Sequence, residues 1–230
     1  MHTDKIHFSF TISRATLSLA LITALCCILL LIRVVQTEEL RGIFLLWNLF
    51  LAWVPLFFAL IARRMTTAGI FSRAEQMLII ISLGFWLLFF PNAPYLITDL
   101  MHLGEFQNHI KWFDSVGFFC AALAGLATGL YSLHVVHQVL NRLMSSILAW
   151  FSIAASTILS GFGLYLGRFI RFNSWDLFTK PFYLFRKSFH ELQNPLAIQT
   201  TLVFTLVVMV LYVSMFILIP SRHANTENAA

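Results

Sequence analysis

The sequence predicts an all-α membrane protein, a six-transmembrane-helix bundle with a Pro-broken third helix and an interfacial helix between helices five and six. Of its 230 residues, 59% are hydrophobic and only 11% are charged, which leaves too little polar surface for a water-soluble globule. Six apolar runs each approach the roughly 20 residues that a helix needs to cross a hydrocarbon core. Because irregular backbone cannot face lipid, these runs are predicted helices of one multi-pass domain, residues 1–230. They cover approximately residues 14–33, 42–62, 77–97, 116–140, 147–169 and 197–219.

The first run is predicted to be a retained membrane anchor. Lys5 and Arg14 precede it, as in a secretory signal peptide, but no small-x-small cleavage site follows. The net charge of +5 would suggest nucleic acid as a partner of a soluble protein. Here the basic residues mostly flank apolar spans, so membrane orientation explains them and no nucleic-acid partner is predicted. The predicted partners are membrane lipids.

Basic residues in the short connections predict that both termini are cytoplasmic. These residues are Lys5, Arg14, Arg63, Arg64, Arg73, Arg142 and Arg222. The connection 168–196 is assigned to the outer side and breaks the rule, because it is also basic. A segment that keeps positive charge against its insertion preference marks function more often than average. The alternative is that five well-oriented spans override one basic loop. The charges of this loop are Arg168, Arg171, Lys180, Arg186 and Lys187 against Asp176 and Glu191.

Residues 89–103 interrupt the third run and carry its polar groups. Pro91 and Pro94 lack amide hydrogens and clash with the preceding turn, which predicts a kink or a stop, with Asn92 between them as a cap. If a helix resumes near Pro94, one polar face follows the i, i+3, i+4, i+7 spacing. Because such a face is unfavourable in lipid, we expect it to face protein, water or a ligand. Its members are Tyr95, Thr98, Asp99 and His102.

The basic connection also contains the predicted interfacial helix. Pro181 can occupy the first turn of a helix. Phe182, Phe185 and Phe189 would then share an apolar face with Leu192, opposite basic side chains, as in helices that lie on a bilayer surface. A connector without chemistry has the same pattern.

Small residues recur at helical spacing in the fourth and fifth runs. Such stripes let helix backbones approach closely in lipid. We therefore expect these two helices to pack together, which would bring Asp114 near Arg168 and Arg171. The stripes are Gly117, Ala121, Ala124, Gly125, Thr128 and Ser132 in the fourth run, and Ser152, Ser156, Ser160, Gly163 and Gly167 in the fifth.

Three segments are thus predicted to place polar side chains on the outer face. Asp99 and His102 are the candidate acid-base pair, and a metal site is not assigned because too few further ligands are at hand. Arg168 and Arg171 can present two guanidinium groups to a phosphate or carboxylate, or instead neutralise nearby aspartates. The candidate binding residues are Asn92, Tyr95, Asp114, Arg168, Arg171, Asn173 and Asp176.

Three stretches resemble a known family. They are the run from Pro91 to Leu103, the triplet Trp112-Phe113-Asp114, and the run from Gly167 to Asp176. Together they resemble the bacterial membrane family catalogued as domain of unknown function 1361, over most of the chain. The resemblance implies a multi-pass protein of a bacterial cytoplasmic (inner) membrane. It implies no activity, cofactor or catalytic residue.

Three hypotheses of function follow from the residues. The first is a membrane-embedded enzyme acting on a phosphate-bearing lipid or lipid-linked substrate at the outer leaflet. In the second, the protein is a small-solute or proton-coupled carrier whose site is the helix break at Pro91 to Pro94. In the third, the polar cluster only locks the helices of a non-catalytic assembly partner. The sequence identifies no cofactor and does not decide whether the protein is an enzyme.

Overall fold

The computed structural model describes residues 13–67, 72–105 and 110–218, and it confirms the all-helical architecture. Six segments are long and apolar enough to cross a membrane, and a short helical segment lies between the fifth and sixth, as predicted. The protein is therefore a multi-pass membrane protein. The elements are α1 (Arg14–Thr37), α2 (Phe44–Thr66), α3 (Arg73–Phe89), α4 (Asn92–Thr98), η1 (Asp99–Glu105), α5 (Lys111–Leu143), α6 (Ser146–Tyr165), η2 (Leu166–Ile170), α7 (Asp176–Thr179), α8 (Pro181–Glu191) and α9 (Pro195–Leu218).

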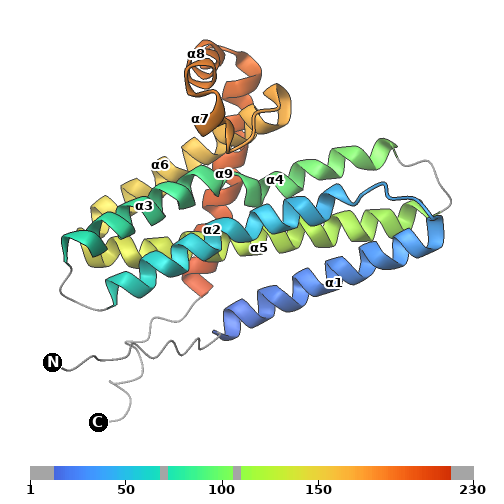
Figure 1. The fold of residues 1–230 in the computed structure, drawn as a ribbon, viewed down its shortest axis with the longest axis horizontal. Coiled ribbons are helices and arrows are strands. Elements are labelled where there is room, and N and C mark those ends of the chain that lie inside the picture. Colours follow the sequence, from blue (N-terminus) through green and yellow to red (C-terminus); the bar gives the residue numbers. More distant parts are fainter. Residues whose placement is uncertain (1–12, 68–71, 106–109, 219–230) are drawn as a thin grey trace, which may run out of the picture.

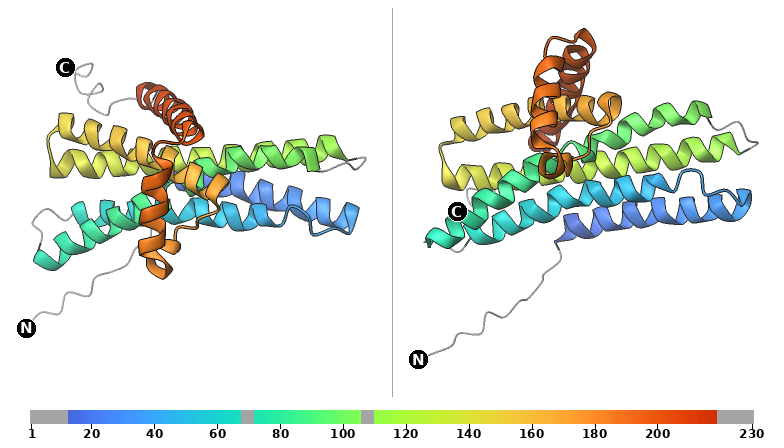
Figure 2. Two further views of the ribbon diagram at one scale, coloured as in Figure 1. Left: turned by 90° about the horizontal axis from the view of Figure 1, so that it is seen from above. Right: turned by 45° about the horizontal axis from the view of Figure 1, so that its top comes forward.

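The long helices form one bundle with a small helical projection. Figure 1 shows α1, α2 and α5 running side by side, with α7 and α8 standing off one side of the bundle. Helix α9 packs along α6 and crosses the direction of α1, α2 and α5, as the views in Figure 2 show. The start of α1 and the end of α9 both lie beside the C-terminal half of α5. Their contacts are Ser13 Oγ to Tyr131 Oη at 3.2 Å and the Phe216 ring to the His137 ring at 5.6 Å.

The start of α1 and the end of α9 thus lie at the same end of the bundle, which agrees with both helix ends facing one side of the membrane. That this side is the cytoplasm stays a prediction. Two of the charges that support it, Lys5 and Arg222, lie outside the described residues.

The third span is kinked at the prolines and then continues. Phe90 and Pro91 keep right-handed helical dihedral angles, so the chain bends between α3 and α4 and does not leave the helical path. The helical path therefore runs from Arg73 to Gly104, whereas the predicted apolar span ends at residue 97. After Thr98 the helix tightens into the 3₁₀ turns of η1.

Two apolar clusters fill the bundle, one toward each end of α5. The kink falls between them, because Phe90 belongs to one cluster and Ala93 to the other. The first cluster contains Cys26, Leu30, Leu45, Leu49, Ala52, Ala93, Leu96, Phe118, Ala121 and Ala124. The second contains Ala59, Trp86, Phe90, Leu133, Val135, Val136, Leu140, Ala149, Ile153, Val208 and Tyr212.

Glycines of α5 let the kinked segment approach closely. A Cβ atom at Gly125 would lie 2.8 Å from the carbonyl oxygen of Ala93, and one at Gly129 would lie 2.8 Å from the Cβ of Ala93. The small stripe of α5 thus receives α4, in the way that small residues permit close helix packing in lipid.

The small stripe of α6 has other partners. A Cβ atom at Gly161 would lie 2.7 Å from the Thr201 carbonyl oxygen of α9, and one at Gly163 would lie 2.8 Å from Cγ of Pro91. Helices α5 and α6 do contact one another, as predicted, but these two glycines of α6 face α9 and Pro91 and not the small stripe of α5. Spacing shows that a helix can be approached closely, but the tilt of the neighbouring helices decides which backbone fills the space.

Candidate functional site

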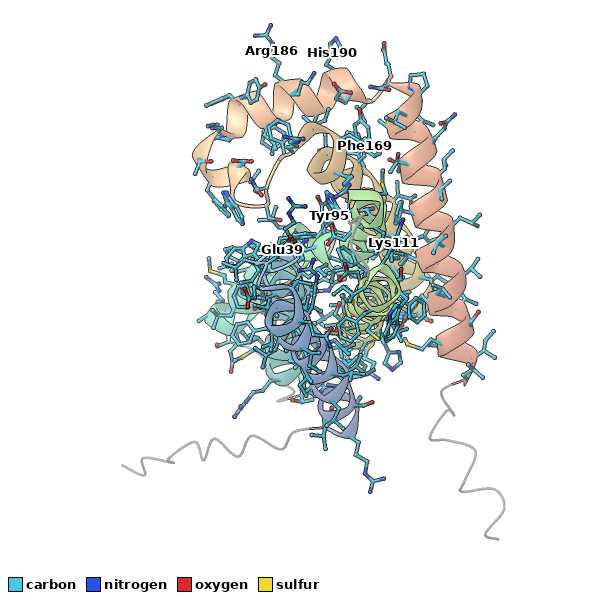
Figure 3. All side chains as sticks on the ribbon, turned by 90° about the vertical axis from the view of Figure 1, so that its right-hand side faces the viewer. Glu39, Tyr95, Lys111, Phe169, Arg186 and His190 are labelled. Carbon is cyan, nitrogen blue, oxygen red and sulfur yellow. The ribbon has the colours of Figure 1, made fainter. Side chains whose placement is uncertain are left out.

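A cavity of about 640 Å³ lies where the kinked third span meets the end of α6 and the connection to α8. Figure 3 looks along the bundle and shows Tyr95 near its middle, below α8. Polar and apolar residues both line the cavity. Its polar lining comes from Asn48, Asn92, Tyr95, His102, Arg168, Arg171, Asn173 and Ser174; its apolar lining comes from Trp47, Leu51, Leu88, Pro91, Leu166, Phe172, Trp175, Leu177 and Leu184, together with Gly163 and Gly167.

Arg168 of η2 connects the two segments that the sequence analysis expected to converge. Its Nη1 lies 3.5 Å from Oδ1 of Asp99 and 3.0 Å from Nε2 of His102. The guanidinium carbon also lies 5.8 Å from the centre of the Tyr95 ring, in cation–π geometry. Asp99 is almost completely buried, so its charge is compensated within the bundle. The structure thus places Asp99 behind Arg168, whereas His102 and Tyr95 line the cavity.

The contact with Arg168 fixes the protonation of His102. A guanidinium nitrogen can only donate hydrogen bonds, so Nε2 of His102 accepts in this contact. His102 is then the neutral imidazole, with its proton on Nδ1. The ring packs edge-on against Phe44 of α2, with centroids 5.3 Å apart.

Asn48 of α2 is the second partner of Asp99. Its Nδ2 donates to Oδ2 of Asp99 at 2.7 Å, and Asn48 also lines the cavity. Asn48 is not among the residues predicted from the sequence to form the site. The available signal was one amide side chain inside the apolar run 42–62, since polar residues within transmembrane segments usually face a partner or a cavity.

The break in the third span is tied to the connection after α6. Nδ2 of Asn92 donates to the carbonyl of Phe89 at 2.9 Å and to Oγ of Ser174 at 3.1 Å. The Ser174 hydroxyl in turn donates to the carbonyl of Leu88 at 3.3 Å. Side chains therefore bind the carbonyls of Leu88 and Phe89, in the last turn before Pro91, which is how buried backbone groups at a proline kink are satisfied.

Arg171 ends the wide turn η2 and faces the cavity opening. Residues Leu166–Ile170 form a π-helical turn, and the N–H of Arg171 donates to the carbonyl of Leu166. Arg171 has φ of 64°, in the left-handed region, and its side chain is exposed. Within the described part of the chain, Arg171 forms no ion pair, in contrast to Arg168.

Asn173 and Asp176 have different positions at the same loop. Asn173 lines the cavity, whereas Asp176 does not. The Asp176 carboxylate accepts the backbone N–H of Asn173 at 2.7 Å and lies 3.3 Å from the Thr179 hydroxyl. Asp176 therefore shapes the loop that begins α7, and it reaches the cavity only through Asn173.

Asp114 lies outside the cavity and belongs to a separate ion pair. Its Oδ1 lies 2.7 Å from Nε of Arg33, and both side chains are buried. Arg33 also donates to the carbonyls of Glu39 and Arg41, so it fixes the connection between α1 and α2. The expected proximity of Asp114 to Arg168 and Arg171 rested on the pairing of the small stripes, which the glycine contacts do not support.

A second polar cluster holds α8 against the bundle. Glu191 accepts from Nζ of Lys187 at 2.8 Å, from the Tyr165 hydroxyl at 2.6 Å and from Nδ2 of Asn194 at 2.8 Å. The Lys187 ammonium, with the Tyr165 and Asn194 donors, lowers the pKa of Glu191 to about 2. Its carboxylate in turn raises the pKa of Lys187. These contacts fix the end of α8, whose Leu184 lines the cavity.

The described residues offer no assembled metal centre. Within them, no group of three His, Cys, Asp or Glu side chains is close enough to hold a metal ion. Asp99 and His102, the i, i+3 pair that most resembles part of such a site, both contact Arg168. A cation beside this guanidinium would be repelled, whereas an anion would be attracted.

Comparison with known families agrees with these motifs. The family model described as protein of unknown function (DUF1361) matches residues 47–215, which is most of the chain. The chain belongs to the DUF1361 family. No curated protein and no solved structure matches it significantly.

The DUF1361 segment contains the whole candidate cavity. Every lining residue, from Trp47 to Leu184, falls within the matched range. Arg33, the partner of Asp114, precedes that range. The cavity therefore belongs to the part of the chain that defines the family, whereas the buried ion pair is half outside it.

Proposed function

We propose that this DUF1361 protein binds the phosphate group of a lipid or lipid-linked substrate in the cavity and acts on it there. The observation that carries the proposal is the pair of arginines at the end of α6. Arg168 is held by Asp99 and His102, while Arg171 lines the same cavity and forms no ion pair within the described residues. Guanidinium groups pair with phosphate oxygens through parallel hydrogen bonds, so Arg171 is the primary anion-binding group.

The remaining polar lining suits a reaction at that phosphate. His102 presents a neutral imidazole whose Nε2 accepts from Arg168. When Arg168 pairs with the bound phosphate, Nε2 is released, and its lone pair can accept a proton from an attacking hydroxyl or water. Asp99 has no place in the cavity lining. Its role in this proposal is to position Arg168, together with Asn48, and so to keep a positive charge beside the bound phosphate.

A carrier is the second candidate, and the kink supports it. The interruption at Pro91 lies within the transmembrane segment Arg73–Gly104 and lines the cavity. Breaks in transmembrane helices form the substrate sites of many transporters, and this proline kink is the corresponding feature here. In a carrier, the same arginines would bind an anion that is released on the other side of the membrane without chemical change.

Binding of a simple phosphate amphiphile to the purified protein tests the shared part of both candidates. The protein would be placed in phosphatidylcholine nanodiscs and titrated with dodecyl phosphate, and the shift in melting temperature would be measured. Arg171→Gln removes a charge-assisted contact and is expected to weaken binding by about tenfold or more. Arg186→Gln is the matched control, because Arg186 lies on α8 and points away from the bundle in Figure 3.

The outcomes separate the hypotheses. Equal binding by the wild type and by Arg171→Gln would refute the anion site. If Arg168→Gln and Asp99→Asn reduce protein abundance while Arg171→Gln has no effect on abundance or binding, the cluster only locks the helices. Lipid profiling of a deletion strain then distinguishes the two candidates, since an unchanged lipid pool contradicts the enzyme.

A further inference from the structure

We infer that the substrate's hydrocarbon chain enters the cavity sideways from the bilayer, between α2 and α7, past a gate formed by Trp47 and Trp175. This inference rests on the proposed function and specifies its substrate as an amphiphile that never leaves the membrane. The phosphate would lie at the two arginines and the chain would extend along the apolar side chains of the lining.

Trp47 and Trp175 form the rim of the cavity on the side of α2. Both line the cavity, and their ring centroids lie 6.4 Å apart. Trp47 is 52% exposed and Trp175 is 39% exposed. Trp47 belongs to a transmembrane helix, where exposed side chains lie against lipid or at its interface. The rim therefore connects the cavity with the hydrocarbon region.

Aromatic side chains continue outward from this rim. Phe50 packs on Trp47 with ring centroids 5.4 Å apart, and Phe178 of α7 stacks on Phe85 of α3 at 6.1 Å. Phe50 and Phe178 are also exposed. Together these rings make an apolar surface that spans α2, α3 and α7 and ends at the cavity, which is suited to the tail of an amphiphile.

Apolar side chains line the cavity together with the polar ones. Leu51 of α2, Leu88 of α3 and Leu177 of α7 belong to the lining in addition to the two tryptophans, and Arg168 and Arg171 provide its charge. In the inferred binding mode, the acyl chain contacts the tryptophans and leucines while the phosphate pairs with a guanidinium. A free inorganic anion has no apolar group that could contact these leucines.

Helix α8 covers another side of the cavity. Leu184 contributes to the lining, and Tyr183 packs edge-on against Phe172 with ring centroids 5.7 Å apart. The Glu191 cluster holds the end of the helix in place. Arg171 and Asn173 are exposed as well as lining the cavity, so these polar side chains retain contact with water. The site is thus bordered by exposed aromatic and exposed polar side chains, which suits a phosphate-bearing lipid.

The test compares two phosphates that differ in their tails. Binding of butyl phosphate and of long-chain phosphatidic acid would be measured in phosphatidylcholine nanodiscs. Leu51→Trp occupies space in the cavity and is expected to weaken phosphatidic acid binding by about tenfold, the equivalent of losing contact with a few methylene groups, and to weaken butyl phosphate binding much less. Leu46→Trp is the matched control, because Leu46 is on the same helix but does not line the cavity.

A photoreactive phosphatidic acid, with the reactive group at the end of one acyl chain, locates the path in the unmodified protein. We expect its adducts on α2 and α7, in higher yield than adducts of phosphatidylcholine that carries the same reactive chain. This excess yield should be lost in Arg171→Gln but not in Arg186→Gln. If both phosphates bind through Arg171 but Leu51→Trp is silent and the adducts lie elsewhere, the side entry is refuted and the proposed function stands. If neither phosphate depends on Arg171, the proposed function itself fails.

Discussion

The buried pair of Arg33 and Asp114 provides a direct test of how the bundle is stabilised. Their side chains are 2% and 0% exposed, and Nε of Arg33 lies 2.7 Å from Oδ1 of Asp114. Removing one partner of a buried ion pair leaves an uncompensated charge and costs roughly 3–5 kcal/mol, whereas replacing both with apolar residues is often close to neutral. We therefore expect Arg33→Leu and Asp114→Leu each to lower the free energy of unfolding by roughly 3–5 kcal/mol.

The double variant should lose far less than the two single variants together. Arg33 also donates to the carbonyls of Glu39 and Arg41, so removing it leaves those groups without that donor. The expected loss of the double variant is therefore about 1–3 kcal/mol. Reversible unfolding in mixed micelles, followed by tryptophan fluorescence, measures all four proteins. Additive losses in the double variant would refute the coupling between the two side chains.

Two further predictions concern the cavity and its cover. Asn48→Leu removes the donor to Oδ2 of buried Asp99, so we expect the free energy of unfolding to fall by about 1–3 kcal/mol in the same micelle assay. An unchanged free energy of unfolding would contradict the role of Asn48 in supporting Asp99. Glu191 has a lowered pKa in the folded protein, so its anchoring of α8 is complete above its ordinary pKa of 4.5 and is lost as pH falls toward about 2. A spin label at Arg186→Cys, in a background without the three native cysteines, should gain mobility over that pH range, and Glu191→Ala should give high mobility already at neutral pH.

The architecture was predictable because it depends on length and hydrophobicity. Each of the six predicted apolar runs corresponds to one of the six long apolar helical segments, and the third segment is kinked at Pro91 and Pro94, as predicted. The helical path extends beyond residue 97, the predicted end of the third span, although the polar residues beyond Thr98 resemble a loop when only hydropathy is considered. In the structure their polar groups face Asn48 and Arg168 within the bundle, so the helical path continues.

Part of the site was predictable because the lengths of the apolar runs determine which polar residues lie at the same side of the membrane. Asp99, His102 and Arg168 were expected on one face of the membrane, and they meet. Side-chain partners within the bundle were not predictable, since they depend on helix tilt and register. Asp114 pairs with Arg33 for this reason, although spacing suggested Arg168. Asn48 was missed because a single amide in an apolar run gives no indication of its partner.

The wide turn η2 makes the end of α6 sensitive to chain length. An α-helix advances by about 100° per residue, so adding or deleting one residue rotates all that follows by that angle. Within the turn, Arg168 faces Asp99 and Arg171 faces the opening. A deletion between Gly163 and Arg168 would turn Arg168 away from its carboxylate, whereas many side-chain replacements there would leave its direction unchanged. Insertions and deletions in this stretch are therefore expected to be eliminated over evolution.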